Sequence, residues 1–315
     1  MKITLVTPAP AHSRYGNRNT AVRWARMLRA LGHTVKVQVA WDGKGADVLI
    51  ALHARRSHDA IRRYAEAFPG RPLVVVLTGT DLYRDIHTDA AAQRSLDLAT
   101  RLVVLHELAP ESLPPPLVSK VRVVYQSATP VRAPRPLASC FEVVVSGHLR
   151  EEKDPFRAAA ALAHLPPTSA IRVTHLGGAL QAEMDQEARG WMAREPRYRW
   201  LGELPHWQAM RVLARSRLMV ISSRMEGGAN VVCEALAVGT PVIASRIPGN
   251  VGMLGADYPG YYPTGDERAL AALMARAESD SRFYRSLQRH CARRRKLVTP
   301  SRERTALRRL LRDPG

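Results

Sequence analysis

The sequence predicts an α/β protein with two doubly wound domains, each a parallel sheet covered by helices on both faces. Short apolar runs typical of buried strands alternate with segments of helical periodicity along most of the chain, which is the pattern of such sheets. The alternation is interrupted at 130–136, where three prolines lie within seven residues, as in a linker. The length of 315 residues also exceeds the usual size of one hydrophobic core. Two domains are therefore expected.

The first domain is expected to span residues 1–133. A buried strand at 2–6 is followed by a helix from about Thr20 to Leu31, which Gly32 ends. The apolar period then changes from about 3.6 to 2, which marks the next strand. Further strands are predicted at 48–52, 73–77, 102–105 and 121–125.

The second domain is expected to span residues 138–298. Its strands are predicted at 141–145, 171–176, 198–201, 218–222 and 241–244, and its helices near 155–164, 181–194, 206–216 and 231–238. Helices continue from about residue 267, and the segment 299–315 is expected to cross back to the first domain through a helix at 301–311. Because ligands of doubly wound sheets bind at the carboxyl ends of the strands, the loops there are where function is expected.

Composition limits the classes of function. The formal charge of +19 is compatible with nucleic-acid binding, but aromatic residues make up only 6% of the chain, and no stretch interleaves basic with aromatic residues. A basic surface with a small anionic substrate explains the charge equally well. We therefore expect no nucleic-acid partner.

The apolar and cysteine content also bears on location. No apolar run approaches the length of a membrane span, and the run after Lys2 is too short for a secretory signal. We therefore expect no stable membrane insertion and a cytoplasmic location. Three cysteines spaced far apart fit neither a disulfide framework nor a zinc site.

The segment 223–241 contains the most informative motif. Gly227 and Gly228 lie in a loop between a predicted strand and a predicted helix, where backbone amides can approach phosphate oxygens. Glu226 precedes the helix and Glu234 lies within it, eight positions later. A carboxylate accepts two hydroxyl hydrogen bonds, which suits a ribose diol or a sugar.

This motif resembles the nucleotide-sugar glycosyltransferases of the GT-B fold. Glu226, Glu234-Ala235 and the segment 239–242 match the two glutamates and the "EA…GTPV" string of that family. The resemblance implies two Rossmann-like domains facing a cleft. It also implies that Glu234 binds the ribose, that Glu226 lies near the transferred sugar, and that Gly227, Gly228, Ala229 and Asn230 contact the diphosphate or the sugar.

A second match follows the first strand of the second domain, at 146–155. Arg150 and Lys153 can clamp the donor diphosphate and neutralise the charge that grows on the departing nucleotide. An exposed cationic pair at a helix start is the alternative. Many relatives have an arginine directly after the glycine, whereas this chain has His148, so which cation contacts which phosphate stays open. Gly177 and Gly202 follow neighbouring strands and in such folds border the nucleobase.

Two segments of the first domain suit an acceptor. The loop 12–20 offers arginines, a glycine, amides and a hydroxyl at a helix N-terminus, which can bind a small oxyanion; its candidate residues are Arg14, Gly16, Asn17, Arg18 and Thr20. A second segment, 77–83, follows a strand. There Thr78, Gly79 and Thr80 can contact a phosphate, and Asp81 can orient a hydroxyl or act as a base. A plain capping loop is the alternative in both places.

These first-domain motifs, with 124–128 and the segment 149–155, resemble the selenosugar synthases of selenoneine biosynthesis. The resemblance implies transfer of a hexose from UDP-glucose or UDP-N-acetylglucosamine to selenophosphate, with a carbon-selenium bond formed at the anomeric carbon. No metal or other cofactor is implied, because the chain has no Asp-x-Asp pair and no His/Cys cluster at ligand spacing.

Two alternatives stay open, as does the oligomeric state. One is a conventional glycosyltransferase acting on a sugar, lipid or small-molecule hydroxyl, for which Asp81 or His106 would supply the base. The other is a noncatalytic binder of nucleic acid or membrane surfaces that uses the basic C-terminal helices.

Overall fold

The structure is a computed structural model that describes residues 1–13, 16–132 and 134–312. The chain divides into two compact units. The first comprises Met1–Gln126, the short stretch Glu226–Gly228 and the segment from Pro300 onward, and the second comprises Ser127–Met225 and Ala229–Thr299. In the described part of the chain no helix is both long and apolar enough to cross a membrane.

The first unit is built on a six-stranded parallel sheet with the order β2-β1-β3-β4-β5-β6. Its strands are β1 (Lys2–Val6), β2 (Thr34–Gln38), β3 (Val48–Leu52), β4 (Leu73–Val76), β5 (Arg101–Val104) and β6 (Val121–Val123). The strand order reverses between β1 and β3. Such a reversal separates the loops at the carboxyl ends of the two strands, and ligands of doubly wound sheets bind there.

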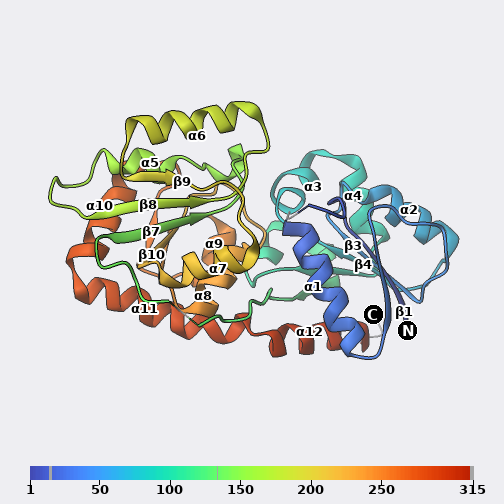
Figure 1. Cartoon of the computed structure of the whole chain (residues 1–315). Coiled ribbons are helices and arrows are strands. Elements are labelled where there is room, and N and C mark those ends of the chain that lie inside the picture. Colours follow the sequence, from blue (N-terminus) through green and yellow to red (C-terminus); the bar gives the residue numbers. More distant parts are fainter. Residues whose placement is uncertain (14–15, 133, 313–315) are drawn as a thin grey trace. The chain divides into compact units, whose positions relative to one another are not determined.

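Helices pack on this sheet, as Figure 1 shows. They are α1 (Gly16–Ala30), α2 (His58–Ala67), the short π-helix η1 (Asp81–Asp85), α3 (Ile86–Thr88), α4 (Ala90–Leu98), the 3-10 turns η2 (Ala109–Ser112) and η3 (Pro115–Lys120), and α12 (Pro300–Arg312). The central strands β3, β4 and β5 are buried along their whole length. A buried parallel sheet needs cover on both faces, and two apolar clusters in this unit reflect that arrangement.

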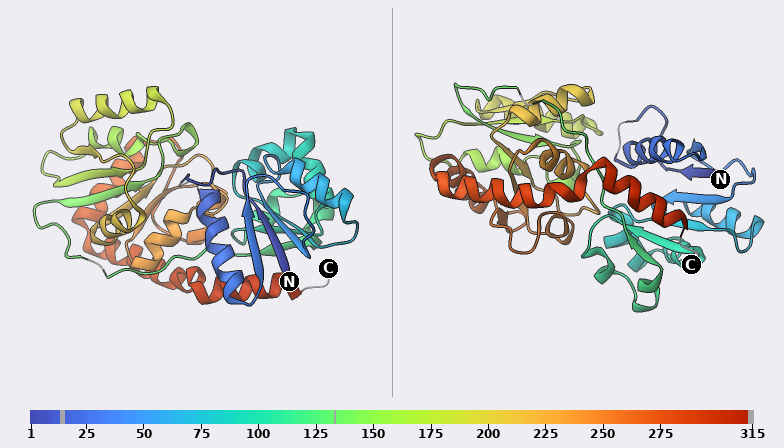
Figure 2. Two further views of the ribbon diagram at one scale, coloured as in Figure 1. Left: turned by 45° about the vertical axis from the view of Figure 1, so that its right-hand side comes forward. Right: turned by 90° about the horizontal axis from the view of Figure 1, so that it is seen from below.

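The C-terminal helix α12 packs beside α1 within the first unit, and the views in Figure 2 agree on this. Its Leu307 and Leu310 join the apolar cluster that contains Trp24. Its Glu303 is 1% exposed, and there it accepts from the indole Nε1 of Trp24 at 2.7 Å and pairs with Arg23 Nε at 3.0 Å. Apolar burial and a paired buried carboxylate therefore both hold α12 in place.

The second unit contains a parallel sheet of six strands with the order β12-β11-β10-β7-β8-β9. The strands are β7 (Phe141–Ser146), β8 (Ile171–Leu176), β9 (Tyr198–Trp200), β10 (Leu218–Ile221), β11 (Val242–Ser245) and β12 (Tyr261–Tyr262). The order reverses between β7 and β10. Read from β9, this is the 3-2-1-4-5-6 order of nucleotide-binding folds.

The helices of the second unit connect these strands. They are the 3-10 turn η4 (Glu151–Lys153), α5 (Arg157–Leu162), α6 (Ala182–Arg194), α7 (His206–Arg215), α8 (Asn230–Val238), α9 (Pro248–Leu254), α10 (Glu267–Ser279), α11 (Ser281–Arg295) and the 3-10 turn η5 (Lys296–Val298). The predicted fold class, two doubly wound parallel-sheet domains, is confirmed.

Some boundaries differ from the expected ones. Helix α1 begins at Gly16, four residues before the predicted start at Thr20, and Thr20 Oγ1 lies 3.0 Å from the carbonyl oxygen of Gly16 one turn earlier. The strand β12 and the helix α9 were not predicted. Each is short, and α9 contains Gly249 and Gly252, which weaken a helical pattern.

Candidate functional site

The loops after β7 and β10 lie at the point where the second sheet reverses its strand order. They contain Arg150 and Lys153 on one side and the segment 222–230 on the other. The loops after β8 and β9, with Gly177 and Gly202, follow next along the same edge. The sheet thus brings the donor-site segments predicted from sequence to one edge, the edge where such folds bind ligands.

Backbone hydrogen bonds fix the loop after β7. The hydroxyl of Ser222, directly after β10, shares its proton between the carbonyl oxygens of Lys153 at 3.0 Å and Asp154 at 2.8 Å. The amide of Arg224 donates to the carbonyl of Glu152 at 2.9 Å. Asp154 has φ +45° and ends the short turn η4. Lys153 is half-buried and Arg150 is exposed, so both cationic side chains are carried on an anchored turn.

A second set of contacts joins the loops after β7 and β8. The amide of Leu149 donates to the carbonyl of Gly178 at 3.0 Å, and the amide of Gly178 donates to Nδ1 of His148 at 3.2 Å. Gly177 has φ +140°, and a Cβ there would lie 2.0 Å from the carbonyl oxygen of Gly147. Because no other residue fits that space, Gly177 is required for the two loops to meet.

A hollow of about 380 Å³ opens beside these loops. Its lining comprises Gly178, Ala179, Leu180, Gln181, Ala182, Asp185, Trp200, Gly202 and Glu203. The indole Nε1 of Trp200 donates to the carbonyl of Gly177 at 2.7 Å, which holds one wall of the hollow. Its volume lies within the range of small-molecule sites.

Helix α8 carries the second predicted glutamate. The helix starts at Asn230, with Ala229 as its N-cap, and Gly239 ends it in the left-handed conformation with φ +85°. The Glu234 side chain is 22% exposed, and His206 at the start of α7 brings Nδ1 to 3.8 Å from its Oε1. His206 was not predicted as a site residue. Glu234 is therefore accessible and has a second polar side chain beside it.

The segment that holds the first glutamate is enclosed. Glu226 is 8% exposed, and Gly227 and Gly228 are buried. These three residues group with the first compact unit, whereas Arg150, Lys153 and Glu234 belong to the second.

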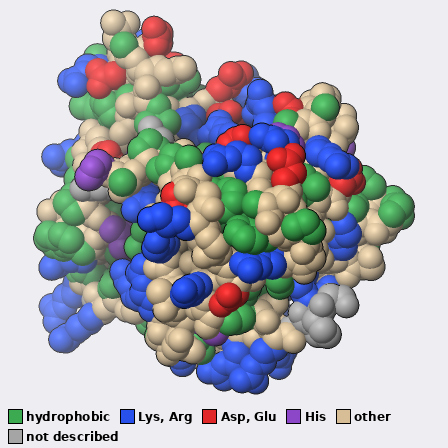
Figure 3. Space-filling view, turned by 90° about the vertical axis from the view of Figure 1, so that its right-hand side faces the viewer, with side chains coloured by type: hydrophobic (Ala, Val, Ile, Leu, Met, Phe, Trp, Pro, Cys, Tyr) green, Lys and Arg blue, Asp and Glu red, His purple; other side chains and the backbone are tan. Residues whose placement is uncertain are grey.

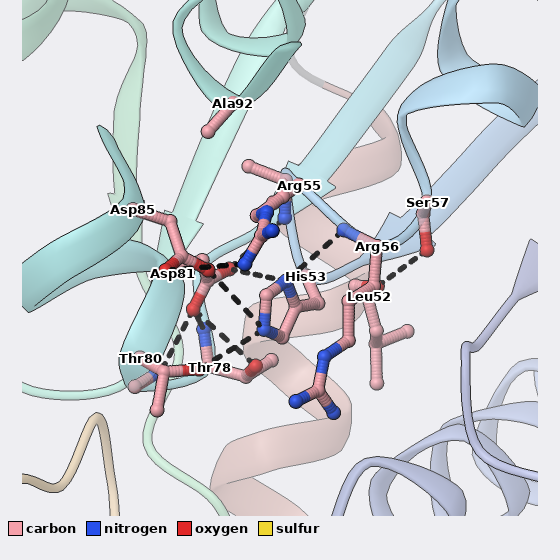
Figure 4. A network of polar contacts seen from close by, with 12 residues as sticks. Leu52, His53, Arg55, Arg56, Ser57, Thr78, Thr80, Asp81, Asp85 and Ala92 are labelled. Carbon is pink, nitrogen blue, oxygen red and sulfur yellow. Dashed lines mark hydrogen bonds and ion pairs between the residues drawn. The ribbon is translucent and has the colours of Figure 1, made fainter. Parts of the chain in front are cut away.

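The segment after β4 in the first unit forms a polar network with the segment after β3 (Figure 4). Asp81 is fully buried. Its Oδ1 accepts from the amides of Thr78 at 2.8 Å and Gly79 at 2.9 Å, and its Oδ2 accepts from the amide of Ala54 at 3.0 Å. A carboxylate held in this way organises the two loops, and both of its oxygens are already occupied.

The same network contains His53, which was not among the predicted site residues. His53 Nε2 lies 3.0 Å from the hydroxyl oxygen of Thr80, and its ring lies near Asp81 and Asp85. Thr78 and Thr80 are half-buried, so part of each side chain faces solvent. The structure therefore presents two threonines at the carboxyl edge of the sheet.

The predicted anion loop before α1 differs from expectation. Gly16, Asn17 and Arg18 form the first turn of α1 rather than a loop. Thr20 is 2% exposed and donates internally, with its hydroxyl 2.9 Å from Oε1 of Gln126. The hydroxyl thus has a partner inside the first unit, and the contact of Thr20 with an acceptor stays a prediction. Arg14 lies outside the described residues.

His106, the other base named for a hydroxyl acceptor, lies in the interior of the first unit. It is fully buried, and its Nε2 lies 2.8 Å from the phenol oxygen of Tyr83. Burial lowers its pKa to about 4. The imidazole is therefore neutral at pH 7 and a weak base.

Across residues 1–13, 16–132 and 134–312, no three His, Cys, Asp or Glu side chains are grouped so that they could hold a metal ion.

The Lys and Arg side chains on the face of the molecule drawn in Figure 3 lie in several separate groups.

Sequence comparison identifies the family to which the chain belongs. The profile of the family described as glycosyl transferases group 1 matches residues 139–296, half of the chain. The chain belongs to this family. Glycogen synthases from two strains of Mycobacterium tuberculosis are 33% identical over 127 residues, which is 38% of this chain. The aligned part spans only 29% of the length of these relatives.

Solved structures with the same fold include two of full length. Anabaena Alr3699/HepE in complex with UDP and glucose matches with a TM-score of 0.78 and 17% identity, over 99% of both chains. The sucrose-phosphate synthase of Thermosynechococcus elongatus matches with a TM-score of 0.79 and 17% identity, over 99% of this chain and 98% of that one. At this identity the likeness establishes the GT-B fold.

Proposed function

We propose that this chain transfers a hexose, glucose or N-acetylglucosamine, from a UDP-sugar to selenophosphate and so forms a carbon-selenium bond, as a selenosugar synthase does. The assignment of the donor site rests on the carboxyl edge of the second sheet. There, around the strand reversal, Arg150 and Lys153 lie in the loop after β7 and Glu234 lies on α8. That place and those residue types suit a nucleoside diphosphate.

The donor would occupy this edge in three parts. Arg150 and Lys153 would contact the diphosphate, and the partly exposed Glu234 would accept from the ribose hydroxyls. The hollow between Gly178 and Trp200 would hold the nucleobase of the donor. The Anabaena structures were determined with UDP, UDP-glucose, or UDP and glucose, which supports a uridine donor. Glu226, Gly227 and Gly228 would lie near the sugar, and Ala229 and Asn230 near the diphosphate.

Neither of the two possible catalytic bases, Asp81 and His106, is suited to deprotonating a hydroxyl. This supports an acceptor that is already an anion when it binds. Asp81 is fully buried, with both oxygens bonded to backbone amides. His106 has a pKa of about 4 because it is buried. A hydroxyl acceptor would need a better base, whereas selenophosphate carries its own nucleophilic anion.

The acceptor would bind in the first unit, at the edge formed by the loops after β1 and β4. Arg18 would supply charge, the Thr80 hydroxyl would supply a hydrogen-bond donor, and Thr78 and Gly79 would line the site. In the reaction the selenium lone pair forms a bond to the anomeric carbon, and the bond from that carbon to the diphosphate oxygen breaks. UDP leaves with that electron pair, while Arg150 and Lys153 stabilise its charge. Water then cleaves the selenium-phosphorus bond and releases phosphate. No metal is required in this scheme.

A conventional glycosyltransferase is the second candidate. The relatives named glycogen synthase and sucrose-phosphate synthase favour it, because their names imply oxygen acceptors. A noncatalytic binder that uses the basic helices is a third, and it would bind anionic vesicles or nucleic acid without affinity for UDP-sugars.

Product analysis separates these candidates. The purified protein is incubated with UDP-glucose or UDP-N-acetylglucosamine, with and without selenophosphate, and products are identified by mass spectrometry. We expect UDP release that depends on selenophosphate, and a product with a hexose bound to selenium. Equal UDP release with a sugar or lipid acceptor alone would remove the selenium assignment. Absence of heat in calorimetry with UDP and with both UDP-sugars would remove the donor assignment as well.

Substitution of Glu234 tests the ribose contact. Glu234→Ala should weaken UDP binding by about 1–3 kcal/mol, because two hydroxyl hydrogen bonds are lost. The side chain is partly exposed, so the lower part of that range is expected. Calorimetry with UDP gives the value, and His206→Ala serves as a control for the neighbouring side chain. Unchanged UDP affinity in Glu234→Ala would refute the ribose assignment.

A further inference from the structure

His53 has a backbone conformation that non-glycine residues rarely adopt. It lies directly after β3 with φ +74°, and in the described residues only Asp154 is a further non-glycine residue with positive φ. His53 is also 2% exposed. Such a conformation persists only where the surroundings impose it, and it occurs often at functional sites. Its place is the point where the first sheet reverses its strand order.

The hydrogen bonds of His53 determine which ring nitrogen carries the proton. The amide of Arg56 is a donor, and it lies 3.3 Å from Nδ1. Nδ1 must therefore accept, so in the neutral ring the proton is on Nε2. Nε2 lies 3.0 Å from the hydroxyl oxygen of Thr80, and it donates to that oxygen. Figure 4 shows His53 between these partners.

The surroundings keep this ring neutral. Burial lowers the pKa of His53, and Arg56 and Arg55 lower it further, whereas Asp81 and Asp85 raise it. The carboxylate oxygens lie 4.0 Å from Nδ1 and 3.9 Å from Nε2 respectively. Asp85 is shared with Arg55, which also pairs with Asp89 at 2.8 Å. The lowered pKa preserves the Nε2–H donor at pH 7.

The hydrogen bond from His53 determines how the Thr80 hydroxyl is oriented. Its oxygen accepts the proton of His53, so its own hydroxyl proton points elsewhere. Thr80 is the N-cap of η1, but its side chain makes no capping hydrogen bond. It is half-buried and lies beside Gly79, whose amide is already engaged by Asp81. The Thr80 hydroxyl is thus held in one orientation, with its proton available to a ligand.

We propose that His53 is a positioning residue for the acceptor: it orients the Thr80 hydroxyl so that this hydroxyl donates to an oxygen of the acceptor anion. This inference rests on the proposed function, in which the acceptor is a phosphate-type anion bound in the first unit. The strained backbone of His53 brings its ring to Thr80 from the neighbouring strand. Asp81, which bonds to the amides of both loops, keeps the two loops in register.

Two substitutions of His53 form a matched pair. His53→Leu removes the donor and His53→Gln keeps an amide donor at similar reach, while both place a side chain of moderate size in the same left-handed backbone. We expect His53→Leu to raise KM for selenophosphate about tenfold, with KM for UDP-glucose changed less than twofold. His53→Gln should recover most of the selenophosphate affinity. A structural role alone would change both KM values and would not be rescued by Gln.

A double-mutant cycle with Thr80 tests the coupling. Thr80→Val should raise KM for selenophosphate, Thr80→Ser should not, and His53→Leu should have no further effect in the Thr80→Val background. Independent effects of the two substitutions would overturn the proposal. Long-range nitrogen-proton NMR spectra of the ring give a readout without substrate: the Nε2–H tautomer is expected for His53, and its signal should shift in Thr80→Val.

The tautomer and the kinetics separate the two claims. An Nδ1–H tautomer would overturn the positioning role even if selenophosphate is the acceptor. Wild-type turnover that does not depend on selenophosphate would overturn the proposed function and the acceptor assignment, while the ring signal would still report whether His53 bonds to Thr80.

Discussion

Gly177→Ala is expected to lower UDP affinity at least about tenfold and to destabilise the second unit by about 1–3 kcal/mol. The added Cβ would lie 2.0 Å from the carbonyl oxygen of Gly147 and 2.8 Å from the amide nitrogen of His148. Both atoms belong to backbone, so side-chain rotation cannot relieve the overlap. The backbone of Gly177 also has φ +140°, which strains an alanine. The loops after β7 and β8 must therefore separate.

The measurement is calorimetry with UDP, combined with thermal unfolding in the presence and absence of UDP. Gly178→Ala is the matched control, because its Cβ would approach the Glu203 side chain no closer than 3.4 Å, an ordinary contact. Separation of the loops would break the bonds from Leu149 to Gly178 and from Gly178 to His148. If both variants bind UDP equally well, the junction of these loops has no part in the donor site.

Lys153→Ala is expected to lower kcat about 100-fold while changing the affinity for UDP-glucose less than tenfold. Charge on the diphosphate grows as the bond to the anomeric carbon breaks, so a cation beside it acts mainly in the transition state. The carbonyl of Lys153 accepts from the Ser222 hydroxyl, which anchors the backbone from which the side chain extends.

Single-turnover kinetics and UDP-glucose titration measure the two quantities separately. Arg224→Ala is the control. Arg224 is a neighbouring cation on the loop after β10, its side chain is 54% exposed, and it lies 4.0 Å from Asp154. Equal losses of kcat and affinity in Lys153→Ala would mean that the lysine binds the ground state instead.

Much of the fold follows from periodicity. The strand predictions at 2–6, 48–52 and 171–176 coincide with β1, β3 and β8, because each is a fully apolar or alternating run bounded by turn residues. Two elements had no such signal. The strand β12 has only two residues, and α9 is a single short helix whose glycines interrupt the pattern. Tertiary packing decides such elements rather than local preference.

The candidate donor segments could be selected from sequence because one short stretch, 223–241, contains several of their residues. The polar network of the first unit was not. His53 and Thr80 are 27 positions apart and meet only because β3 and β4 are neighbours in the sheet. Similarly, Thr20 and Asp81 are buried and bond to Gln126 and Ala54, which are distant in sequence, and no local pattern reveals such contacts. Sequence analysis selected Thr20, Thr80 and Asp81 for their chemistry but not His53, and the partners of all four are seen only in the structure.

The position of α12 affects how the protein is made. Residues 300–312 are translated after the whole of the second unit, yet Leu307, Leu310 and Glu303 complete the interior around Trp24 in the first. A nascent chain that ends before residue 300 would therefore leave an apolar surface and the indole nitrogen of Trp24 uncovered. We expect the half of the protein that leaves the ribosome first to be the half that finishes folding last.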